Sequence, residues 1–129
     1  MEKSLGHFVR AVLEGVGYSQ KQCVDVLKGM GVPTTDMMLC GGGARSPLWR
    51  QILTDLYGCP VKTCKASEEG PALGAAILAG VGTGVFSSVE QACDKIVVPD
   101  NLHQPVADNA AAYEPYYNLY KSLYPALKE

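Results

Sequence analysis

Three consecutive glycines, Gly41–Gly43, separate a short apolar run at 36–40, "DMMLC", from a helix start at Ser46 and Pro47. Glycine loses more conformational freedom on folding than any other residue, so three in a row need a structural or functional reason. The order strand, glycines, helix is typical of sites for anions or nucleotides, because a helix N-terminus offers unpaired N–H groups and a partial positive charge. A tight turn between strand and helix is the purely structural alternative.

Hydrophobic periodicity predicts helices on either side of this segment. Apolar residues recur at helical spacing over residues 5–30, which indicates one long helix, or two end to end, closing near 29–31. Ser46 as the cap and Pro47 at the first helical position predict the start of the next helix, and Gly58 ends it.

The strands are predicted to be few and buried. The run at 36–40 and "PVKTC" at 60–64 alternate with helices, which indicates parallel strands and an α/β fold. A helix built of Ala and Gly follows at 70–82, and we expect it to be buried because it lacks a polar face. Buried parallel strands need neighbours on both edges, so two short strands packed with several helices indicate part of a larger sheet.

The remainder of the chain is predicted to be a connector between helices. Ser87 and Glu90 indicate a capping box before a helix at 89–97. Residues 98–109, marked by prolines, are expected to be an extended connector. A terminal helix follows, whose tyrosines we expect to pack on the domain with their hydroxyls at the surface: Tyr113, Tyr116, Tyr117, Tyr120 and Tyr124.

Composition excludes several classes of protein. A net charge of −2, without a Lys/Arg stripe, argues against nucleic-acid binding. The longest apolar stretch, around 71–85, is too short and glycine-rich to span a membrane, and residues 1–18 carry scattered charges unlike a secretory signal. His7 and His103 are isolated. An odd number of cysteines without a C-x-x-C pair predicts reduced, small buried side chains in a cytoplasmic protein: Cys23, Cys40, Cys59, Cys64 and Cys93.

A dinucleotide-binding turn fits the glycines poorly. Gly41–Gly43 supply G-x-G, but the third fingerprint position falls on Ser46. An acid is expected after the following strand, where Lys65 stands, and Glu68 and Glu69 come slightly later. A phosphate loop of the G-x-x-x-x-G-K-[ST] type is absent from the sequence.

Two longer runs resemble the C-terminal domain of the FGGY carbohydrate kinases, within them most closely the xylulokinase branch. They are "LCGGGARSPLWRQILTDLYGCPV" at 39–61 and "EEGPALGAAILAGVG" at 68–82. "HFVRAVLE" at 7–14 matches the closing half of the family's second signature, and 112–129 resembles its terminal helix. The resemblance covers nearly the whole chain. It implies an actin-like ATPase, ribonuclease H-like α/β fold, in which two such domains close on a cleft for MgATP and a sugar.

The resemblance also implies a site. By position, the segment 41–46 matches the family's adenosine motif, so that Gly42, Gly43 and Ala44 would offer main chain to the nucleoside. Ser46 would lie near the adenine, and Arg45 would either cover it or face solvent. The candidate cofactor-binding residues are Gly41, Gly42, Gly43, Ala44, Arg45 and Ser46. Glu69 would reach the nucleotide or, as we favour, cap its own helix.

The catalytic parts are expected elsewhere. In the family the catalytic aspartate, the sugar site and the phosphate-gripping turns lie upstream of a segment like this one, and Mg²⁺ is held mainly there. The aspartates here are expected to be solvated or capping charges: Asp25, Asp36, Asp55, Asp94, Asp100 and Asp108. Residues 1–129 are thus expected to form a partial C-terminal, nucleotide-binding domain without an internal boundary.

The expected activity of the full-length protein is transfer of the γ-phosphate of ATP to a ketopentose, D-xylulose first, with this chain inactive alone. Missing strands would leave apolar faces open, so we expect self-association or a homodimer. Two alternatives stay open. One is a non-enzymatic nucleotide-binding or oligomerisation module. The other, disfavoured by Ser46 and Lys65, is a dehydrogenase fragment.

Overall fold

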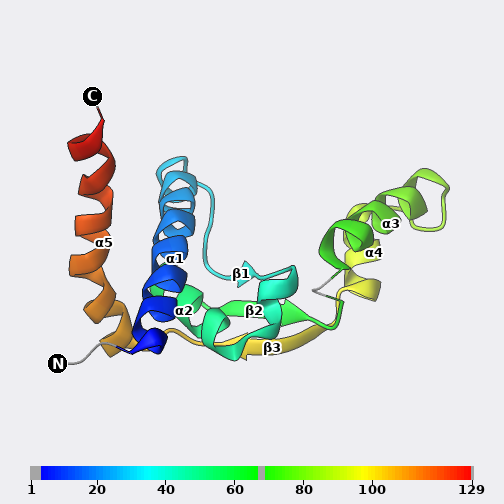
Figure 1. Cartoon of the computed structure of the whole chain (residues 1–129). Coiled ribbons are helices and arrows are strands. Elements are labelled where there is room, and N and C mark those ends of the chain that lie inside the picture. Colours follow the sequence, from blue (N-terminus) through cyan, green and yellow to red (C-terminus); the bar gives the residue numbers. More distant parts are fainter. Residues whose placement is uncertain (1–3, 67–68, 129) are drawn as a thin grey trace.

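The structure is a computed structural model and describes residues 4–66 and 69–128. Glu68, considered above as a ribose ligand, lies outside the described residues. The elements, shown in Figure 1, are in chain order α1 (Leu5–Gly29), β1 (Met37–Met38), the short 3₁₀-helix η1 (Gly42–Arg45), α2 (Pro47–Tyr57), β2 (Val61–Cys64), α3 (Gly70–Gly82), α4 (Val89–Ile96), β3 (Pro99–His103) and α5 (Ala107–Leu127).

The described strands form one mixed sheet in the order β1-β2-β3. β1 and β2 are parallel, with Met37 opposite Val61, which confirms the predicted parallel pair. The extended connector expected at 98–109 is wrong in part, because its residues 99–103 form β3, antiparallel to β2. Pro99 is tolerated as the first residue of this strand, where its missing N–H breaks no ladder. Without an apolar alternation, this strand had no sequence signal of its own.

The core lies around α2, which contacts α1, α5, β2 and β3. Figure 1 shows α1 and α5 as neighbouring columns at one end of the molecule, with α2 at their base. All residues from 52 to 57 are buried, because neighbours cover several sides of this short helix. The buried cluster comprises Tyr18, Val24, Ile52, Leu53, Leu56, Tyr57, Cys59, Val61, Tyr113 and Tyr117.

The helix α3 is exposed, so the prediction that it is buried is wrong for this chain. Ile77 is its one buried residue, and Leu78 is 64% exposed. Together with α4 it projects at the opposite end of the molecule from α1 and α5 (Figure 1). The ring of Phe86 lies so close to Gly80 that a Cβ there would be 2.7 Å from it. The small side chains of α3 therefore allow close packing against α4 and the segment that joins the two helices. The other faces of α3 contact little of the described chain.

Several helix ends follow the expected chemistry. The first helix is continuous from Leu5 to Gly29. Ser46 caps α2, whose first residue is Pro47, and Gly58 ends it in the left-handed region. The capping residue of α4 is Ser88, one residue later than predicted, and its Oγ accepts from the N–H of Gln91. The pairing of Ser87 with Glu90 is therefore wrong.

Two tyrosines of α5 turn inward, contrary to the expectation of surface hydroxyls. Tyr117 is buried and donates to Asp25 at 2.6 Å. The Tyr113 hydroxyl accepts from Arg10 at 2.6 Å and donates to Glu14 at 3.1 Å. These buried hydroxyls need partners, and the partners are charged groups on α1. These hydrogen bonds hold α5 against α1.

Three smaller expectations have outcomes in the structure. All five cysteines are free, but Cys23 and Cys40 are exposed, so the expectation of buried side chains is wrong for these two. Asp25 is more than a solvated charge. Partial burial alone would raise the pKa of Asp25, but the hydrogen bond from Tyr117 and the charge of Lys21 hold this pKa below its usual value. Within the described ranges, no helix is both long and apolar enough to cross a membrane.

Two glycines of α1 predict opposite responses to alanine. A Cβ on Gly17 would lie 2.5 Å from Leu56 Cδ1 in the packed core, whereas a Cβ on Gly15 meets nothing within 4 Å. We expect Gly17→Ala to lower the free energy of unfolding by about 1–3 kcal/mol, because the core must shift. Gly15→Ala should raise it by about 0.5–1 kcal/mol, because alanine favours the helix. Urea unfolding of both variants measures this. A stabilised Gly17→Ala would contradict the packing described here.

Candidate functional site

The three glycines of residues 41–46, which we call the glycine turn, are there for different reasons. Gly41 has φ +90°, a conformation that residues with a side chain rarely adopt. A Cβ on Gly43 would be 2.9 Å from Trp49 Cδ1. A Cβ on Gly42 would meet nothing within 4 Å, and its φ is not positive. Neither turn geometry nor packing against the described residues explains Gly42, whose bare main chain faces open space.

The turn is closed by its own main chain and by the start of α2. The N–H of Ala44 donates to Gly41 O at 2.9 Å, and the N–H of Ser46 donates to Gly43 O at 3.2 Å. Ser46 Oγ accepts from the N–H of Trp49 at 3.3 Å as the cap of α2. The serine hydroxyl can still donate to a ligand, because a hydroxyl both donates and accepts.

Ala44 and Arg45 differ sharply in exposure. Ala44 is 3% exposed, and its carbonyl accepts from Arg50 Nη1 at 2.5 Å. Because its N–H is also bonded, both polar groups of its main chain are used inside the protein. With both polar groups bonded and its surface almost fully buried, Ala44 has little to offer a ligand directly. Gly42, Gly43 and Arg45 are exposed residues.

A partly buried chain of hydrogen bonds leads from the turn through Arg50 to β3 and α2. Arg50, 9% exposed, also donates from Nε to His103 Nε2 at 2.8 Å. Since Nε2 accepts, the ring proton is on Nδ1, which lies 3.3 Å from Gln51 Oε1. Gln51 Nε2 in turn donates to Asp55 Oδ1 at 2.8 Å. Burial, and then the charge of Arg50, lower the pKa of His103.

Asp55 ends this chain. It is not the solvated charge that was one expectation, and it is the capping charge that was the other, although the helix it caps is distant in the sequence. It is 3% exposed and accepts from the main-chain N–H of Val106 at 2.8 Å and from Asn109 Nδ2 at 2.9 Å. Val106 is the capping residue of α5. Asp55 therefore caps a helix more than fifty residues away. The one local sign was the i, i+4 spacing from Gln51, which does not reveal a distant partner.

The helix α3 approaches the strand exit just before the turn. A Cβ on Gly70 would lie 3.0 Å from Cys40 Cβ, which accounts for the missing side chain there. Glu69 occupies the capping position of α3, but its side chain makes no capping hydrogen bond, so that expected role is wrong. The first turn of α3 thus packs against the segment that leads into the glycine turn.

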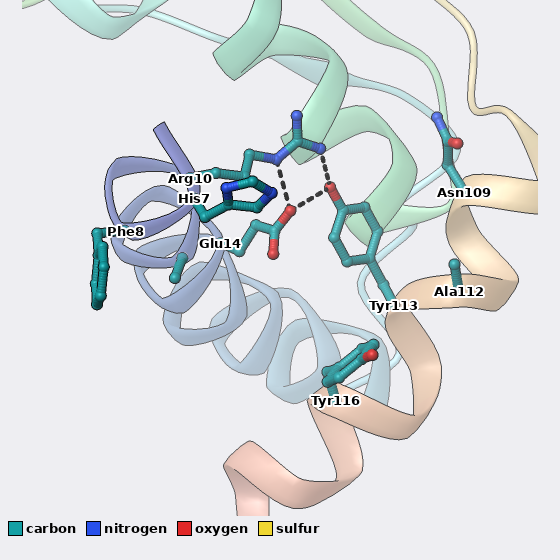
Figure 2. A pocket seen from close by; sticks show the side chains of 9 residues that line it. His7, Phe8, Arg10, Glu14, Asn109, Ala112, Tyr113 and Tyr116 are labelled. Atoms are coloured by element: carbon teal, nitrogen blue, oxygen red, sulfur yellow. Dashed lines mark hydrogen bonds and ion pairs between the residues drawn. The ribbon is translucent and has the colours of Figure 1, made fainter. Parts of the chain in front are cut away.

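A separate cavity of about 650 Å³ lies between the first turns of α1 and α5 (Figure 2). No sequence signal pointed to it. Arg10 donates to Glu14 at 2.6 Å and to the Tyr113 hydroxyl, and His7, Asn109 and Tyr116 also line the space. Because the charge of Arg10 is balanced by Glu14, this cavity is a poor electrostatic match for the phosphates of a nucleotide.

Metal-ligating residues do not gather anywhere in residues 4–66 and 69–128. No group of three or more His, Cys, Asp or Glu side chains there could hold a metal ion. The described part of the chain therefore has no preformed cation site of this kind.

Comparison with known proteins gives consistent matches. The model of the FGGY family of carbohydrate kinases, C-terminal domain, matches residues 1–83. Over 122 residues the chain is 35% identical to a xylulose kinase of Staphylococcus epidermidis, covering 95% of this chain and 24% of that protein. It is 38% identical over 118 residues to the Escherichia coli K12 xylulose kinase, covering 92% and 24%. An autoinducer-2 kinase of Salmonella typhimurium is 37% identical over 94 residues, 73% of this chain and 18% of the other.

A solved structure agrees with these relatives. The crystal structure of xylulose kinase from Rhodospirillum rubrum matches with a TM-score of 0.81 and 29% identity, over 98% of this chain and 26% of that one. The chain thus spans about a quarter of the length of the proteins it matches. The matches confirm the resemblance and the expected actin-like α/β fold.

The His103 contact predicts a pH effect on stability. The folded pKa is lowered from 6.5, so the unfolded chain binds a proton first as the pH falls. The stabilisation that neutral His103 contributes is complete above about pH 6.5 and is lost progressively below it. In His103→Gln, the amide oxygen can replace Nε2 as acceptor without titrating. We expect its unfolding midpoint to fall less than that of the unmodified chain between about pH 8 and about pH 5.5. Equal pH slopes would contradict the assignment.

Proposed function

The chain belongs to the FGGY family of carbohydrate kinases, and from that premise we propose that residues 1–129 form part of the C-terminal domain and hold the nucleoside end of ATP. The complete protein would transfer the γ-phosphate of ATP to a sugar hydroxyl. The relatives are about four times longer than the matched segment, and we propose that the catalytic groups correspond to the part of those relatives that this segment does not match. The chain alone is proposed to be inactive as a kinase.

The observation that carries the proposal is the open main chain at Gly42. Gly41 is explained by its positive φ and Gly43 by Trp49, whereas neither reason applies to Gly42, where the space beside the main chain is open. A planar base or a ribose needs such a surface, because a side chain would hold it away from the backbone. Ser46 and Arg45 flank this surface and would supply polar contacts.

Magnesium fits the described residues poorly. Phosphoryl transfer needs Mg²⁺ at the β- and γ-phosphates, and no acidic cluster of the kind that holds it lies in the described ranges. Mg²⁺ would be bound with the phosphates by the remainder of the enzyme. The role proposed for this chain is limited to the nucleoside.

Among sugars, a ketopentose such as D-xylulose is the first candidate. The first relatives are xylulose kinases, at 35% and 38% identity. The autoinducer-2 kinase, 37% identical over a shorter segment, supports autoinducer-2 as a second candidate substrate. Free cysteines are compatible with a reducing compartment, and we propose the cytoplasm.

Self-association is also proposed for the chain alone. One side of α1 exposes apolar side chains at helical spacing: Leu5 (78%), Phe8 (65%), Val9 (52%), Val12 (67%) and Val16 (48%). A contiguous apolar stripe of this kind is uncommon on a monomer and marks a contact surface.

Substitution at Gly42 tests the nucleotide proposal. A Cβ there has free space, so Gly42→Ala should fold with an unchanged unfolding midpoint. If the nucleoside lies on this main chain, the new methyl group should weaken ADP binding about tenfold, a cost of roughly 1.4 kcal/mol. Calorimetric titration with ADP measures the affinity. Gly15→Ala, whose Cβ also meets nothing within 4 Å, is the matched control and should bind ADP as the unmodified chain does. Equal affinity in Gly42→Ala and the control would argue against the proposed site.

A further inference from the structure

We propose that Arg50 and His103 are positioning residues that set the orientation of the glycine turn, and that β3 thereby controls the nucleoside surface. The consequence for nucleotide binding rests on the proposed function. The effect on the turn itself does not. Neither residue was a site candidate in the sequence, and neither lies within the turn.

The first step concerns the peptide that follows Ala44. A trans peptide is planar, so its C=O and N–H point in opposite directions. Arg50 Nη1 holds the Ala44 carbonyl at 2.5 Å on the buried side. The N–H of Arg45 is therefore directed away from the guanidinium, and rotation of this peptide would require breaking a charge-assisted hydrogen bond. One buried arginine thus fixes the direction of the main chain beside Gly42 and Gly43.

The second step concerns what holds Arg50. A long, flexible side chain positions another group only if it is itself held. Its Nε donates to His103 Nε2 at 2.8 Å, and the ring is fixed on its other side by Gln51. His103 stands opposite Val61 in the β2–β3 pairing, so its place is set by the sheet. The guanidinium is consequently held between the sheet and the turn.

The third step distinguishes this arrangement from ordinary core packing. The main-chain bonds inside the turn join residues within 41–46 to each other and do not fix how the turn faces the sheet. The turn is held by two side chains of α2: Trp49 packs against Gly43, and Arg50 donates a hydrogen bond to the carbonyl of Ala44. Through its second hydrogen bond, to His103, Arg50 connects the carbonyl of Ala44 to β3, which lies more than fifty residues later in the chain.

Amide hydrogen exchange by NMR on the 129-residue chain tests the positioning role without a ligand. We expect Arg50→Gln to accelerate exchange at residues 44–46 by about tenfold, because the hydrogen bond to a charged donor is lost. Exchange in the middle of α1 should stay within about twofold. Arg10→Gln is the matched control. It removes an arginine that also makes two side-chain hydrogen bonds, near the N-terminal end of α1, and it should leave exchange in the turn unchanged.

Two histidine variants test the second step. His103→Gln keeps an acceptor for Arg50 and should keep slow exchange in the turn. His103→Leu removes the acceptor and should accelerate exchange there by about threefold to tenfold. A purely structural role predicts the same change throughout β3 and α2 in both variants. That uniform change would overturn the proposal, as would an Arg50→Gln variant with unchanged exchange at residues 44–46.

Titration with ADP connects the positioning role to binding. We expect Arg50→Gln to bind ADP about tenfold more weakly, with Arg10→Gln unchanged. If the unmodified chain binds ADP and Arg50→Gln binds it equally well, the inference fails while the proposed function stands. If the unmodified chain shows no ADP binding, the proposed function fails, and the exchange rates in the turn still decide whether Arg50 positions it.

Discussion

Burial of α2 on several sides is the constraint on which the remainder of the structure depends. Fully burying a large apolar side chain contributes about 1.5–3 kcal/mol, and α2 buries Ile52, Leu53 and Leu56. Such burial is possible only if every polar group on the helix finds a partner inside. Thr54 Oγ1 donates to Arg50 O at 2.7 Å, and Asp55 accepts three hydrogen bonds. Within the described residues, no buried side-chain polar atom is left without a partner.

The position of α2 in turn determines the candidate site. Because the glycine turn leads directly into this helix, its place is set by the cap at Ser46, by Trp49 against Gly43 and by Arg50 on the Ala44 carbonyl. These contacts all lie on the protein side of the turn. The opposite side, at Gly42, is left as bare main chain. We propose that the nucleoside binds on this side, since a surface already held in place needs little ordering on binding.

Local patterns predicted some elements well and others poorly, for identifiable reasons. The extent of α1, the start of α2 at Ser46 and its end at Gly58 depend on periodicity and caps within a few residues, and they were predicted correctly. β3 was missed because its strand conformation comes from pairing with β2 rather than from its own alternation. Burial of α3 was predicted wrongly. An apolar composition indicates that a helix needs a packing partner, but it does not show that the described chain contains one.

The sequence by itself determined the family, the parallel pair of strands and the position of the glycine turn, because motifs, caps and hydrophobic periods are written in neighbouring residues. Only the tertiary structure decided what each glycine is for, and that Asp55 caps α5 and Arg50 reaches both Ala44 and His103. Two of these contacts, Asp55 with Val106 and Arg50 with His103, join residues about fifty positions apart. Their geometry depends on how α2, β3 and α5 pack, which no local pattern encodes.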